Sequence, residues 1–224
     1  MKRYPHLSGN KNKDREIKKP HLEARPPSEN FKKMRKIVFD IETKNTFQQA
    51  GSNNPADLDI SVVCIYDYET DRYNSYLEKD FKNLWPIIEK ADMLIGYNSE
   101  HFDTPLLNKY YPGDLTKIKS LDIMKEIKNS LGRRMKLDTI SEATLGKKKI
   151  GHGLEAITWW KNGEVDKIIK YCLEDVKITK EVYEYALKNN SLKYKDGNEL
   201  KDIKLDTSLW EKEETSSITH TLPF

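Results

Sequence analysis

The chain has 224 residues, of which 37% are hydrophobic and 33% are charged, and its formal net charge is +3. This length suits one ordinary domain with tails, or at most two small domains, and the apolar content is enough to form a core. The mean hydropathy is −0.81, no apolar run approaches the length of a membrane span, and the first residues, MKRYPHLSGN, lack the apolar segment of a secretory signal. We therefore expect a cytoplasmic protein with no membrane partner.

The chain contains only two cysteines, Cys64 and Cys172, and each lies in an apolar stretch. Disulfides are rare in reducing compartments, and neither cysteine has the neighbours of a zinc ligand. We expect both to be reduced, buried thiols.

The charge is distributed unevenly along the chain. Residues 1–36 hold 12 Lys or Arg and 4 Asp or Glu, whereas residues 37–224 hold 27 and 32. Residues 1–34 also contain four prolines and almost no apolar periodicity, which predicts a flexible basic arm. Such an arm commonly meets a phosphate backbone, although a solvated tail that only aids solubility is the slightly favoured explanation.

The chain after the arm begins with three expected strands, at residues 36–41, 58–69 and 72–77. They are rich in β-branched and aromatic residues, and the last two are separated only by the turn residues Thr70 and Asp71. This pattern predicts an antiparallel meander.

The remainder of the chain is mostly helical. Two further buried strands are expected at 92–97 and 118–123. Helices are expected at 81–91, 103–111, 122–131, 137–145, 153–162 and 164–189. Asp80 is a candidate cap for the first of these helices. Residues 192–205 form a hairpin pattern around Asp196–Gly197.

A meander followed by two strands with crossover helices predicts an α/β fold, in which a mixed five-stranded sheet has helices on both faces. The first, fourth and fifth strands would be parallel, and ligand sites in such sheets lie beyond their carboxyl ends. We expect the domain with this sheet to span residues 35–190, with a C-terminal hairpin and tail at 191–224.

Acidic residues gather at that predicted edge. Asp40 and Glu42 are two positions apart on the first strand, so their side chains point the same way. Asp103 follows the fourth strand, and Asp175 lies in the last helix, four residues after Tyr171 and on the same helical face. Each has an ordinary explanation by itself, since Asp103 suits a helix cap and Tyr171 suits the core.

The set of four acids is harder to explain without cations. Like charges gathered at one edge repel unless positive charge lies between them, and hard carboxylate oxygens suit Mg²⁺ or Mn²⁺. We expect two such ions, about 4 Å apart, which together support hydrolysis of a phosphodiester. The expected ligands are Asp40, Glu42, Asp103 and Asp175.

Three ordered segments carry a family resemblance. FDIET at 39–43, NSEHFD at 98–103 and YCLED at 171–175 resemble the three motifs of the DEDD 3′–5′ exonucleases, in the branch whose third motif has Tyr. SLDIM and MKLDTISEATLGKKK resemble segments of family-B DNA polymerase exonuclease domains and of ribonuclease H-like domains that accompany helicases. The resemblance covers about residues 35–190 and implies a ribonuclease H-like fold.

The resemblance also implies roles for the catalytic residues. Asp40, Glu42 and Asp175 would hold one metal ion, and Asp40 with Asp103, directly or through water, would hold the other. Tyr171 would position the attacking water. The implied partner is single-stranded DNA or RNA with a free 3′ end, and a helicase or polymerase is a possible protein partner.

Several further residues are candidates for binding the substrate. They are Thr43, Asn98, Lys147, Lys148 and Lys149. Asn98 contacts the terminal nucleotide or braces its own loop, and the three lysines either follow a phosphate backbone or form a solvated loop. Trp159 and Trp160 are expected in the core, although a stacking surface for a base is the alternative.

Two other functions remain open. One is a catalytically weak or inactive nucleic-acid-binding module that acts with a helicase or polymerase. The other is a phosphatase-like hydrolase with an Asp nucleophile, which the Asp-x-Glu pattern at residues 40–42 disfavours because the second Asp is missing.

Overall fold

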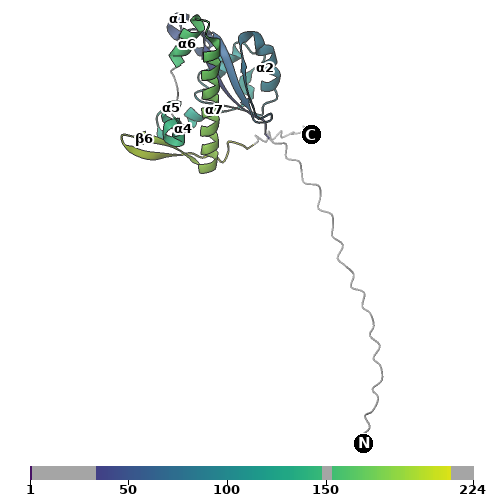
Figure 1. Cartoon of the computed structure of the whole chain (residues 1–224), viewed down its shortest axis with the longest axis vertical. Coiled ribbons are helices and arrows are strands. Elements are labelled where there is room, and N and C mark those ends of the chain that lie inside the picture. Colours follow the sequence, from purple (N-terminus) through teal and green to yellow (C-terminus); the bar gives the residue numbers. More distant parts are fainter. Residues whose placement is uncertain (2–33, 148–152, 213–224) are drawn as a thin grey trace, which may run out of the picture. The chain divides into compact units, whose positions relative to one another are not determined.

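The computed structural model describes Met1 and residues 34–147 and 153–212. Its centre is a five-stranded sheet with the strand order β3-β2-β1-β4-β5 (Figure 1). The strands are β1 (Lys36–Thr43), β2 (Ile60–Asp67), β3 (Arg72–Tyr76), β4 (Met93–Gly96) and β5 (Lys119–Asp122). β1, β2 and β3 pair antiparallel, whereas β4 is parallel to both β1 and β5. The predicted fold class, a mixed α/β sheet, is confirmed.

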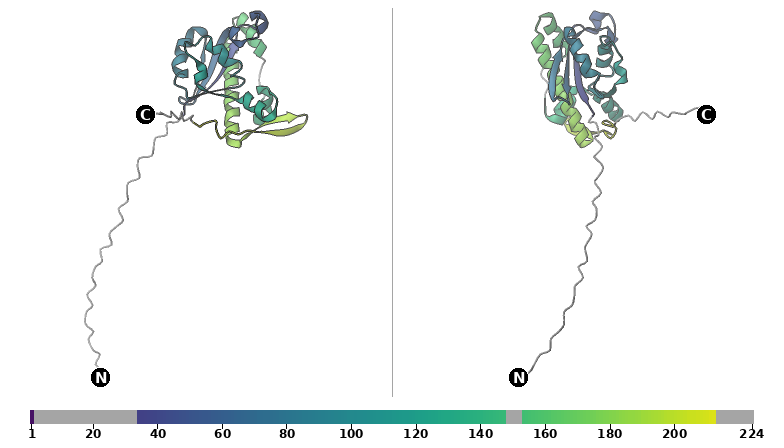
Figure 2. Two further views of the ribbon diagram at one scale, coloured as in Figure 1. Left: turned by 180° about the vertical axis from the view of Figure 1, so that it is seen from behind. Right: turned by 90° about the vertical axis from the view of Figure 1, so that its right-hand side faces the viewer.

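Helices cover both faces of this sheet (Figure 2). The α-helices are α1 (Phe47–Ala50), α2 (Phe81–Ile88), α3 (Asp103–Asn108), α4 (Ile123–Leu131), α5 (Leu137–Leu145), α6 (Gly153–Lys161) and α7 (Val165–Asn189). Three short 3₁₀ helices connect elements, η1 (Pro55–Asp57), η2 (Glu78–Asp80) and η3 (Leu115–Lys117). No helix in the described ranges is both long and apolar enough to cross a bilayer.

Alternation along β1 divides the core into two parts. Ile37, Phe39 and Ile41 are buried in the cluster that includes residues of α2 and α3. Val38 points the opposite way, into the cluster that contains the buried face of α7. Asp40 has the same parity as Val38, so it faces α7. Ile41 is buried in this way and anchors the acidic end of the strand in the core.

The long helix α7 packs across β1 and β2, and Cys172 lies at the contact. The Cys172 thiol donates to the backbone oxygen of Asp40 at 3.4 Å, and Asp40 pairs with Cys64 across β1 and β2. Both thiols are free and buried, as expected, and burial raises the pKa of Cys172. This contact places α7 directly over the acidic end of β1.

The C-terminal hairpin has also formed as predicted, from β6 (Ser191–Asp196) and β7 (Glu199–Lys204). Gly197 occupies the turn with a φ of +61°, a conformation that glycine adopts without strain. The hairpin is attached to α5, because Thr144 and the backbone of Lys193 exchange two hydrogen bonds.

One local prediction was wrong, and another is confirmed in part. Asp80 does precede α2, but its side chain makes no capping hydrogen bond, because η2 already delivers the chain into the helix. Trp159 and Trp160 pack against the core, as predicted, but are only half-buried. The short helix α6 packs against α7 and β1.

Candidate metal centre

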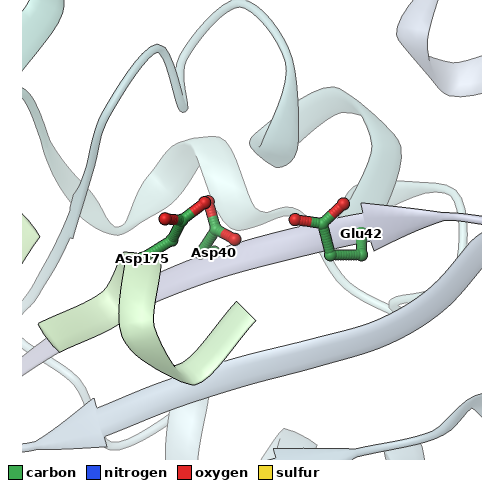
Figure 3. Close-up of side chains that lie close together, drawn as sticks. All are labelled: Asp40, Glu42 and Asp175. Atoms are coloured by element: carbon green, nitrogen blue, oxygen red, sulfur yellow. The ribbon is translucent and has the colours of Figure 1, made fainter. Parts of the chain in front are cut away.

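Three carboxylates converge at the carboxyl end of β1. Asp40 and Glu42 project from the same face of the strand, and Asp175 faces them from α7 (Figure 3). Each residue offers one oxygen, and these oxygens lie within 4.8 Å of one another. Glu42 is 9% exposed and Asp175 is 5% exposed, so the charges gather where little water can screen them.

The chain leaves room for this cluster by turning sharply after β4. β1 pairs with β4 only as far as Val38 and Ile95. A Cβ atom at Gly96 would lie 2.4 Å from the Ser99 side chain, so only glycine permits the close return of the loop that follows. The turn delivers the chain to Asp103 within a few residues.

Asp103 lies beside the three-acid cluster and is not one of its members. It is the first residue of α3, with Phe102 at the cap position, so the alternative that Asp103 is a helix cap was wrong. Its carboxyl group is buried and accepts a backbone hydrogen bond from Ile41, which joins it to β1. Burial, with a smaller contribution from the charge of Asp122, raises the pKa of Asp103 to about 8.

This pKa predicts how the stability of the metal-free protein depends on pH. Between about pH 4 and 8 the native state holds a proton on Asp103 that the unfolded chain has already lost. The free energy of unfolding should therefore fall as the pH rises, by up to about 1.4 kcal/mol per pH unit from this group. Urea unfolding in EDTA across this range, compared between wild type and Asp103→Asn, measures the effect. The variant should show a flatter dependence, and parallel curves would contradict the assignment.

Tyr171 lies one helical turn before Asp175, as the spacing predicted. Its side chain is 6% exposed and packs edge-on against Trp159, with 5.9 Å between the ring centroids. The neighbouring Trp160 is contacted by Lys44, whose ammonium lies 5.2 Å from the indole ring. The tryptophans thus border the site, and Trp159 supports the tyrosine.

The structure places three of the five candidate substrate-binding residues. The Thr43 hydroxyl donates to the backbone oxygen of Asn45 at 3.0 Å, beyond the end of the acidic cluster. Asn98 adopts a left-handed backbone conformation with a φ of +66°. Lys147 forms an ion pair with Glu181 on α7. Lys148 and Lys149 lie outside the described residues, and the binding role of all five stays a prediction.

Asp122 supports the site through two sets of hydrogen bonds. It caps α4 by accepting hydrogen bonds from the amides of Met124 and Lys125. The same carboxylate accepts from the amides of Asn98 and Glu100, at 2.8 and 3.2 Å. It therefore holds the loop before Asp103. These residues come together because β4 and β5 are parallel and Gly96, at the end of β4, pairs with Asp122, at the end of β5.

The donor set fits a hard divalent cation. Three carboxylate oxygens within 4.8 Å, with no histidine or cysteine among them, are the ligands that Mg²⁺ or Mn²⁺ takes. Two of the acids come from one strand and one from a helix that is anchored to it, so the arrangement is held by the fold. The residues present could thus hold such ions.

Comparison with known proteins points to one superfamily. Residues 37–187, more than half of the chain, match the RNase H superfamily. Among curated proteins, no sequence matches the chain.

Two solved structures share the fold. The family B DNA polymerase from the archaeon Pyrobaculum calidifontis superposes with a TM-score of 0.54 at 18% identity, over 69% of this chain and 24% of the polymerase. RNase D from Trypanosoma brucei gives a TM-score of 0.51 at 14% identity, over 69% of this chain and 58% of RNase D. The chain therefore spans about a quarter of the polymerase and somewhat over half of RNase D. At these identities the likeness shows the fold alone.

Proposed function

Because the chain belongs to the RNase H superfamily, we propose that it is a metal-dependent nuclease that shortens single-stranded DNA or RNA from the 3′ end. The observation that carries this proposal is the convergence of Asp40, Glu42 and Asp175, whose carboxylate oxygens lie within 4.8 Å of one another. The exonuclease type and the 3′–5′ direction are proposed from the resemblance of the three motifs, with Tyr171 in the third, to those of the DEDD 3′–5′ exonucleases.

Each side chain would have a defined task in this reaction. Asp40, Glu42 and Asp175 would hold Mg²⁺ or Mn²⁺, with Asp103 completing the set from the adjacent helix. Two bound ions would supply Lewis-acid stabilisation of the negative charge that develops as the phosphodiester is hydrolysed. Asp122 would keep the loop before Asp103 in place through its two hydrogen bonds to that loop.

Tyr171 would orient the attacking water through its phenol, on the same helical face as Asp175. Tyr171→Phe removes one hydrogen bond and leaves the carboxylates intact, so we expect the single-turnover rate to fall by about 10- to 100-fold. Tyr185→Phe, on the same helix, is the matched control and should not slow the reaction. A loss as large as that of the acid variants would show that the role of Tyr171 is misassigned.

The proposed direction is tested with an oligonucleotide labelled at its 5′ end. In Mg²⁺ or Mn²⁺ we expect a ladder of labelled products that shorten one nucleotide at a time, with release of 5′-mononucleotides. The same strand with a 3′-phosphate, or joined into a circle, should resist. Cleavage of the circle would instead indicate an endonuclease, and parallel digestions of DNA and RNA identify the preferred substrate.

A second candidate function is supported by the coverage of the polymerase. The chain corresponds to about a quarter of that protein, which suits a domain that works beside a polymerase or helicase. In that case the chain would bind single strands with little hydrolysis of its own. Strand binding without shortened products in Mg²⁺ or Mn²⁺ would favour this function.

A further inference from the structure

A polar cavity of about 400 Å³ lies beside the loop that connects β4 to Asp103. Asn98, from that loop, and Asp122, at the end of β5, form part of its wall. Lys125 and Lys128 line it from α4, and Arg134 lines it from the segment between α4 and α5. None of these basic residues belongs to a motif that the proposed function uses.

The cavity has an excess of available positive charge. The acidic residues that line the cavity are Glu100 and Asp122. Glu100 forms an ion pair with Lys125, and the Asp122 carboxylate accepts hydrogen bonds from four backbone amides. Lys128 and Arg134 are exposed, and within the described parts of the chain neither forms an ion pair with a carboxylate. These two cations are therefore open to an anionic ligand.

The sheet register places this cavity on the same edge as the metal centre. Val38 of β1 pairs with Ile95 of β4, and the next residue of β4, Gly96, pairs with Asp122 of β5. Asp40 therefore lies about one residue beyond the level of Gly96 and Asp122, and β1 continues from there to Thr43. β5 is two strands from β1, so Asp122 on β5 is roughly 10 Å across the sheet from the strand that carries Asp40. A ligand long enough to occupy both would have to be extended and repeatedly charged.

We propose that this cavity binds the backbone of the single strand at a phosphodiester other than the one that is cleaved. Lys125 and Lys128 are three residues apart, so they share one face of α4, and Arg134 adds a planar guanidinium that suits phosphate oxygens. Exposed cations spread over a helix and a loop fit a continuing backbone better than an enclosed small anion. The inference rests on the proposed function for its substrate class, single-stranded nucleic acid.

The test measures binding in EDTA, so its result does not depend on hydrolysis. Fluorescence anisotropy with a labelled ten-nucleotide oligothymidylate is followed over about 50 to 200 mM salt, for the full chain and for Lys128→Gln/Arg134→Gln. We expect the double variant to bind about tenfold more weakly at low salt. The slope of log affinity against log salt should become shallower by about 0.7 for each cation removed. Lys82→Gln on α2, which packs on the other face of the sheet, is the matched control and should match wild type.

Three outcomes would overturn the inference. An unchanged salt slope in the double variant would exclude a backbone contact. If Lys82→Gln lost as much binding affinity as the double variant, the effect would reflect the net charge of the protein and not a contact in this cavity. If inorganic phosphate raises the melting temperature of wild type but not of the double variant, while oligonucleotide binding is equal, the cavity holds free phosphate only.

Each single variant should show about half of the change in slope. If the strand binds here and is never shortened, the nuclease proposal fails and this one stands.

Discussion

Asp40→Asn and Asp175→Asn should each lower the rate of 3′-nucleotide release by about a thousandfold or more. Each change keeps the shape of the side chain and removes one negative charge from the cluster of three carboxylates. Metal ions contribute several kcal/mol to the stabilisation of such transition states, and about 4 kcal/mol corresponds to about a thousandfold in rate. Single-turnover digestion of a labelled strand measures the loss.

The matched control is Glu174→Gln, which neutralises the acid next to Asp175 in sequence. Glu174 lies on another side of α7, near Lys177, and its side chain is 45% exposed. It should retain wild-type activity. Thermal melting in EDTA checks the fold, and the Asn variants should be at least as stable as wild type, because removal of one charge relieves repulsion between buried carboxylates. Full activity in either Asn variant would contradict the assignment of the site.

Chelation should abolish hydrolysis completely, and added Mg²⁺ or Mn²⁺ should restore it. The same ions should raise the melting temperature of wild type, because a ligand that binds only the native state stabilises it, by about 2.7 kcal/mol at a concentration one hundred times its dissociation constant. The increase in melting temperature should be larger above about pH 8. At that pH the Asp103 carboxyl group is already ionised, so the cation does not have to displace its proton. Asp40→Asn should show little increase. Persistent hydrolysis in EDTA would exclude metal-dependent chemistry.

Much of the fold followed from local sequence patterns. The apolar runs that became β1, β2 and β4 are buried, and alternation along β1 predicted that Asp40 and Glu42 share a face. The four-residue spacing of Tyr171 and Asp175 likewise predicted that both lie on one side of α7. These features depend only on the periodicity of one element.

Features that depend on contacts between elements were harder to predict. The position of Asp103 outside the group of three reflects its hydrogen bond to the backbone of Ile41, which no spacing reveals. Lys147 pairs with Glu181, a residue 34 positions away that only the packing of α5 against α7 brings near. The double role of Asp122 depends on the register between β4 and β5.

The claim that the carboxylates share divalent cations is tested most directly by Mn²⁺ binding to the full chain without nucleic acid. Electron paramagnetic resonance follows the free ion as the chain is titrated. We expect wild type to remove the free-ion signal in a saturable manner, whereas Asp40→Asn and Asp175→Asn each lose most of this binding and Glu174→Gln retains it. Identical titration curves for wild type and the two Asn variants would contradict the claim.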